Sequence, residues 1–255
     1  MFGNMACQII GYYLIAIAAI PLGYGHVTRR RWARTLSMTL LWFWLVVGVP
    51  LTIVFLFILV TAKDLSLIAV LIAIVAMGAS YLVLPGLLIR FYRSRDVRLT
   101  FETRDPRSYR IEELPLPILV LCALYSFYAI VLHVPIFFNG MFPLFGDFVY
   151  ELPGILMLDV SIMLLVCLIW GTWRRSSWAW WGGLVYFGLL TSSSILTFAK
   201  SDYLDILSMM KFAPLEMKAL QGLPFQGFYF AVFFGVPLLI TLGLIVASKR
   251  HFKVR

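Results

Sequence analysis

Seven long apolar segments divide this chain, and nearly all of its positive charge falls on alternate connections between them. A helix needs about 20 apolar residues to cross the ~30 Å hydrocarbon layer of a bilayer. The segments of this length are 5–25, 36–62, 65–91, 115–139, 152–173, 178–199 and 225–247. In lipid each must be helical, because only a helix satisfies the hydrogen bonds of its own backbone. The sequence therefore predicts an all-α, polytopic transmembrane helix bundle with about seven spans, forming one domain over residues 1–255.

The composition also favours a membrane protein over a soluble one. Charged residues make up only 13% of the chain and hydrophobic residues 62%, whereas about 25% of the residues in a typical soluble domain are charged. The first apolar segment has no basic residues before it and no small-residue cleavage motif after it. We therefore expect that segment to remain in the mature protein as a span.

The basic residues predict how the bundle is oriented. All but four of the 21 Lys and Arg residues share one side, and the exceptions are Lys63, Lys200, Lys211 and Lys218. Cytoplasmic connections are enriched in Lys and Arg, so the N-terminus is predicted outside and the C-terminus in the cytoplasm. Because the charge follows the topology, the net charge of +9 does not indicate nucleic-acid binding. The 15 Arg against 6 Lys and the short connections favour the plasma (inner) membrane of a bacterium.

The inner basic loop, residues 93–114, is predicted to contain a short helix. Ser94 is suited to cap it, with Asp96 in its first turn, and Val97 and Phe101 would then share one face. The alternative is a strand, because apolar and polar residues alternate from Val97 to Phe101. A lone strand has no partner here, so the helix is favoured. Lipid headgroups are the expected contacts of Arg95, Arg98 and Arg104, since arginines at the inner face attract anionic lipids. The alternative role for this loop is binding a cytoplasmic protein.

The outer amphipathic loop, residues 201–224, is predicted to form two short helices at 201–210 and 214–221. The second has proline at its first position and a glycine just past its end, as helices often do. The nearby outer loop 140–151 is rich in aromatic residues. We expect the two loops together to cover the outer end of the bundle.

Several polar residues are predicted to lie at similar depth inside the outer half of the spans. A rise of ~1.5 Å per residue places them about 8–12 Å below the outer ends of their helices. They are Asp159, His133, Ser192, Ser193 and Ser194. An acid within a span is a candidate functional site, because burying its charge costs about 2.5–3.5 kcal/mol. The candidate role is binding a ligand or proton, and the alternative is a structural layer that joins helices.

No motif in the chain indicates catalysis. There is no nucleophile elbow and no phosphate-binding lysine loop. The three histidines, His26, His133 and His251, fall near opposite faces, so they are not expected to form a zinc centre. The sequence therefore predicts no catalytic residue, no metal and no cofactor.

The leading functional interpretation is a non-enzymatic integral membrane protein, either an accessory subunit of a membrane complex or a protein that acts alone. One alternative is a small-solute or proton-coupled transporter that uses the polar layer around Asp159. The other is a lipid-modifying enzyme at the inner arginine loop. The expected partners are membrane lipids, with anionic headgroups at the inner face, and other membrane subunits.

Overall fold

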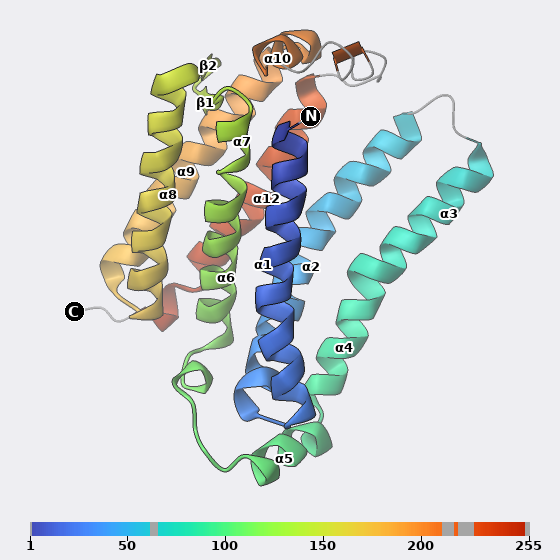
Figure 1. Cartoon of the computed structure of the whole chain (residues 1–255), viewed down its shortest axis with the longest axis vertical. Coiled ribbons are helices and arrows are strands. Elements are labelled where there is room, and N and C mark those ends of the chain that lie inside the picture. The colour runs from blue at the N-terminus through green and yellow to red at the C-terminus, as the bar shows by residue number, and fades with distance from the viewer. Residues whose placement is uncertain (1, 62–65, 211–216, 219–226, 253–255) are drawn as a thin grey trace.

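The computed structural model describes residues 2–61, 66–210, 217–218 and 227–252, and the chain is a bundle of helices (Figure 1). Six helices in this part of the chain are long and apolar enough to cross a membrane. They are α2 (Arg31–Thr61), the continuous helix from α3 to α4 (Leu67–Arg93), α6 with α7 (Leu116–Phe137), α8 (Glu151–Trp173), α9 (Ser177–Lys200) and α12 (Gly227–Ala247). These helices confirm the predicted all-α transmembrane fold.

A further helix, α1 (Phe2–Val27), corresponds to the first predicted span, and its apolar part is Gly11–Val27. The N-terminus lies at the same end of the bundle as α10 (Tyr203–Met209) and a short β-hairpin (Figure 1). The opposite end holds α5 (Arg95–Arg104). The described residues thus contain six spans, and a crossing by the first predicted span stays a prediction. We call the α5 end of the bundle, which is predicted to be cytoplasmic, the inner end, and the opposite one the outer end.

Four helices enclose the main apolar core, namely α6, α8, α9 and α12. Tyr125 of α6 stacks on Phe187 of α9, with ring centroids 5.2 Å apart. The indole N–H of Trp180, buried between α9 and α12, donates a hydrogen bond of 2.8 Å to the Ile245 carbonyl. This bond removes the cost of burying an indole donor. Trp180 is thus a core residue, although it lies among tryptophans at the inner α8–α9 turn.

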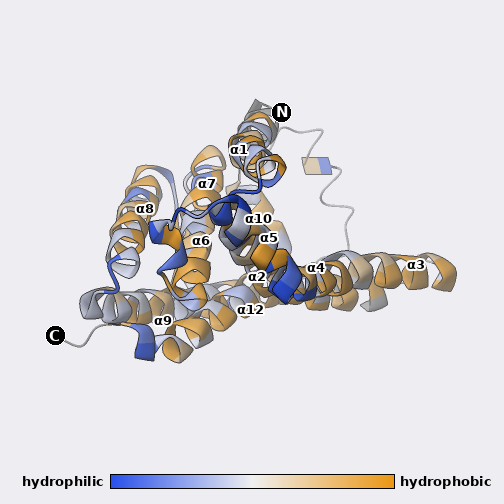
Figure 2. Cartoon of the chain, turned by 90° about the horizontal axis from the view of Figure 1, so that it is seen from below, coloured by the Kyte–Doolittle hydropathy of each residue, from blue (hydrophilic) through white to orange (hydrophobic). Residues whose placement is uncertain are grey.

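The helix from α3 to α4 lies at the edge of the bundle. In Figure 2 the apolar α3 (Leu67–Gly78) runs away from the other helices, and none of its residues is buried. Between α3 and α4 (Leu84–Arg93) the chain forms a π-helical segment, Ala79–Val83. Pro85 explains this segment, because its ring conflicts with the carbonyl four residues earlier and a wider turn relieves the conflict.

The predicted span 115–139 is interrupted near its outer end. Helix α6 (Leu116–Val131) stops, and a short helix, α7 (Val134–Phe137), follows after Leu132 and His133. Pro135 contributes to this break, because it has no N–H to donate to the carbonyl of residue 131.

At the inner end, the short helix predicted in the basic loop is confirmed as α5. Its N-cap is Ser94, whose hydroxyl accepts a hydrogen bond of 3.4 Å from the Val97 N–H, and Asp96 lies in the first turn. The strand alternative is wrong. At the outer end, α10 matches the first helix predicted in loop 201–224. The second predicted helix, 214–221, lies almost wholly outside the described residues.

Candidate functional site

A β-hairpin lies where an aromatic loop was predicted at the outer end of the bundle. Strand β1 (Phe142–Leu144) pairs antiparallel with β2 (Asp147–Val149). The turn between them contains Gly146 with a φ of 111°, a conformation that strongly favours glycine. The hairpin packs against α8 and α9.

Two hydroxyl groups of α9 hold the turn of this hairpin. Ser193 Oγ accepts a hydrogen bond from the Phe145 N–H (2.9 Å) and donates one to the Pro143 carbonyl (2.8 Å). One helical turn further on, Thr197 Oγ1 accepts from the Gly146 N–H at 2.9 Å. Thr197 was not singled out in the sequence, although its spacing of four from Ser193 places both on one helix face. Ser193 thus ties α9 to the hairpin through both of its hydrogen bonds.

The other polar residues of the predicted layer bond locally. Ser192 Oγ donates to the Gly188 carbonyl at 2.9 Å, one turn back in its own helix, which is common for Ser and Thr in membranes. His133 Nδ1 lies 2.7 Å from the Ala129 carbonyl, and Ser194 is buried. No hydrogen bond within the described part of the chain joins Asp159 to any of these residues.

Asp159 lies on the outward face of α8. Its side chain is exposed, and it makes no hydrogen bond or ion pair with any other described residue. The buried face of α8 is a different one, formed by residues such as Leu158, Ser161 and Leu165. The structure thus turns the carboxylate of Asp159 away from the bundle.

The exposed residues around Asp159 repeat at intervals of four and three. Leu152, Leu156, Met163, Val166 and Trp170 are all more than half exposed, with Asp159 between the second and third. Residues at this spacing form the contact line between helices that pack in left-handed pairs. We call these six residues the α8 seam.

At the inner end, Asp105 joins the basic loop to the α1–α2 turn. Its buried carboxylate accepts hydrogen bonds from the Tyr109 hydroxyl (3.0 Å) and the Arg31 N–H (3.4 Å), and it lies 3.6 Å from Arg30. Burial opposes ionisation of Asp105, but these donors outweigh it and hold the pKa of the carboxyl below its usual range. Arg31 also forms an ion pair of 2.7 Å with Glu112.

Of the three arginines predicted to contact lipid headgroups, one is paired within α5. Arg98 donates to Glu102 at 2.7 Å, and this hydrogen bond raises the pKa of Arg98 and lowers that of Glu102. Arg95 and Arg104 are exposed and form no ion pair with other described residues. Contact with anionic headgroups stays a prediction for all three.

The helices define a class, which is a multi-pass helical membrane protein. Comparison with known proteins finds no matching family model, no matching curated protein and no matching solved structure. Within the described residues, no group of three or more His, Cys, Asp or Glu side chains is placed to hold a metal ion.

Proposed function

We propose that this chain is a non-enzymatic accessory subunit of a complex in the bacterial plasma (inner) membrane, and that it binds a helix of its partner along the α8 seam. The observation that carries the proposal is the exposed, unpartnered carboxylate of Asp159 in the middle of that seam. An acid in this position requires a polar neighbour that lipid tails do not provide.

The depth of Asp159 makes lipid an unfavourable neighbour. It lies eight residues from Glu151, which is about 12 Å along the helix from the outer end of α8. A long Lys or Arg side chain can reach back to the headgroups from such a depth, but the short side chain of Asp cannot. Lipid tails offer no hydrogen-bond donor, so an exposed carboxylate here costs about 2.5–3.5 kcal/mol.

A second membrane helix supplies what lipid lacks. The residues of the α8 seam on either side of Asp159 are apolar, so they suit a partner helix along their whole length. The partner that fits Asp159 places a basic, amide or hydroxyl donor at the same depth, because such a group hydrogen-bonds the carboxylate without water. Charged groups inside membranes are usually paired in this way.

The two alternative functions have less support. A transport role for Asp159 needs its carboxylate to face a path through the protein, whereas the side chain faces outward. A lipid-modifying activity needs catalytic side chains gathered at the inner face. There the carboxylates of Asp105 and Glu112 are engaged by Arg30 and Arg31.

The proposal is tested by a photo-crosslinking amino acid placed on the seam at Met163. In native membranes we expect this probe to form one discrete adduct with a different protein. Asp159→Leu should reduce the adduct about three- to thirtyfold, the range expected from losing a polar contact between membrane helices. Asp159→Asn should keep most of it, because an amide still hydrogen-bonds. The readout is the adduct mass and yield.

The matched control carries the probe at Val185, which is exposed on α9 at a similar distance from the inner end. It should give lipid adducts alone. The proposal is wrong if Met163 also gives lipid adducts alone, or if Asp159→Leu leaves the protein adduct unchanged. An adduct of twice the mass of this chain would mean that a second copy occupies the seam, and would overturn the accessory-subunit role.

A further inference from the structure

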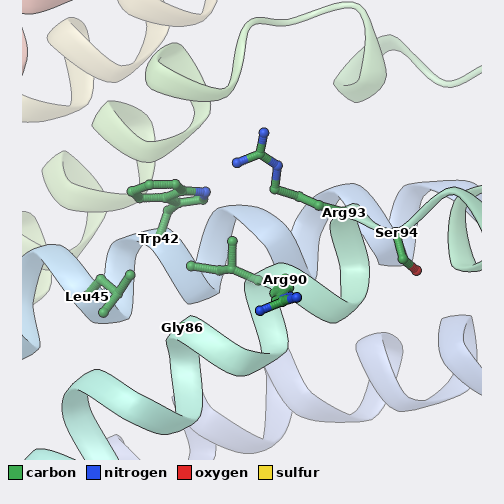
Figure 3. Close-up of a pocket in the computed structure, with 7 residues that line it drawn as sticks. Trp42, Leu45, Gly86, Arg90, Arg93 and Ser94 are labelled. Carbon is green, nitrogen blue, oxygen red and sulfur yellow. The ribbon is translucent and has the colours of Figure 1, made fainter.

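A cavity of about 570 Å³ opens at the inner end of the bundle, between α2 and α4 (Figure 3). It lies one turn or less from the start of α5, at the level where the basic loop begins. The residues that line it are Trp42, Leu45, Gly86, Ile89, Arg90, Arg93 and Ser94. None of them is acidic, and none belongs to the α8 seam.

The polar groups of this cavity are hydrogen-bond donors without acceptors. Arg90 and Arg93 form no ion pair or hydrogen bond with other described residues. The indole nitrogen of Trp42 is buried and has no hydrogen-bond partner. In Figure 3 this nitrogen points to the side from which Arg93 extends. Ser94 Oγ accepts from the Val97 N–H, which leaves its hydroxyl hydrogen to donate.

Four nearby arginines are different, because each of them already has an acceptor. Arg30 and Arg31 pair with Asp105 and Glu112, and Arg98 pairs with Glu102. Arg34 donates to the Tyr92 carbonyl at 3.0 Å. Three acids of this region, Asp105, Glu112 and Glu102, are therefore engaged by these arginines. Two guanidinium groups and a buried indole donor remain around one cavity, which is an arrangement that binds an anion.

The deeper part of the cavity is apolar. Leu45 and Ile89 form its walls, and a side chain added at Gly86 would meet nothing within 4 Å. Gly86 lies one helical turn from Arg90 toward the membrane interior. An amphipathic ligand would thus find cationic donors at headgroup level and an open apolar surface beneath them.

We propose that this cavity binds a phosphate group, carried by an anionic phospholipid of the inner leaflet. The two arginines grip the phosphate oxygens, the Trp42 N–H and the Ser94 hydroxyl add single donors, and the first part of an acyl chain lies along Leu45 and Gly86. Phosphate suits guanidinium donors because its oxygens accept paired, fork-like hydrogen bonds.

The test is a binding titration of the purified full-length protein in detergent, followed by native mass spectrometry. The probes are phosphatidylglycerol, phosphatidylcholine and inorganic phosphate. We expect phosphatidylglycerol to bind about tenfold more tightly than phosphatidylcholine, since the choline cation is repelled by the arginines. Arg90→Gln combined with Arg93→Gln should weaken phosphatidylglycerol binding at least tenfold. Trp42→Phe, which keeps an aromatic ring but removes the donor, should weaken it about fivefold.

The matched control removes the same charge elsewhere in the basic loop, by Arg107→Gln combined with Arg110→Gln, two exposed residues that do not line the cavity. It should change phosphatidylglycerol binding by less than about twofold. Thermal melting of every variant confirms that it is folded. An equal loss in the two double variants would overturn the proposal, because net charge alone would then explain binding. Displacement of the lipid by inorganic phosphate below millimolar concentration would overturn the phospholipid assignment in favour of a soluble phosphate ligand.

Discussion

Gly154→Ala is expected to destabilise the bundle by about 3 kcal/mol, the upper end of the usual cost of adding atoms to a packed site. A Cβ at this position of α8 would lie 1.9 Å from the Gly140 carbonyl oxygen and 2.7 Å from that of Val149. Both are backbone atoms at the ends of the β-hairpin, so neither can move aside by changing a rotamer. The substitution therefore separates the hairpin from α8.

The measurement is thermal melting in detergent, where a loss of this size should lower the midpoint by about 6–12 °C. The control is Gly188→Ala in α9, where an added Cβ meets nothing within 4 Å. Alanine has the higher helix propensity, so this variant should melt at or slightly above the parent. Equal melting of the Gly154→Ala and Gly188→Ala proteins would contradict the docking of the hairpin on α8.

The second large effect is expected in cysteine labelling, which tests the orientation of the chain in the membrane. Each introduced cysteine should react either fully or not at all in intact cells. Cysteine introduced at Asp147, exposed in β2, should react with a membrane-impermeant thiol reagent in intact cells. Cysteine at Arg104, exposed at the end of α5, should react after the cells are permeabilised and not before. The reason is the concentration of Lys and Arg on the α5 side of the bundle. The parent chain, with its native cysteines, is the control, and the reverse labelling pattern would show that the orientation is wrong.

The fold class was predictable because transmembrane helices depend on length and hydropathy, which are local properties. The cap at Ser94 was predictable for the same reason, since it bonds three residues away. The β-hairpin was not. Its strands have three residues each, and the groups that hold its turn, Ser193 and Thr197, come about 50 residues later. The π-helical segment before Pro85 likewise depends on how a proline is accommodated within a long helix.

The candidate sites show which properties of a residue in a membrane helix can be predicted from sequence. Position along a helix follows from counting residues, and Asp159 lies eight residues after Glu151, in the half of α8 that begins beside the β-hairpin. The direction in which a side chain points around the helix axis does not follow from counting. Helix α8 is apolar on nearly every side, so its sequence offers no polar face to orient it. The phosphate cavity was missed for a related reason. The sequence places Arg90 and Arg93 only in the inner basic region as a whole, and Trp42 meets them through the packing of α2 on α4.

The central claim is that a partner helix covers Asp159, and carbodiimide labelling tests it most directly. A lipid-soluble carbodiimide reaches carboxyl groups that face the hydrocarbon, and peptide mass mapping locates the modified residue. We predict that Asp159 is modified at least tenfold faster in the chain purified alone than in native membranes, where the partner shields it. Equal rates in the two preparations would contradict the claim and leave Asp159 facing lipid.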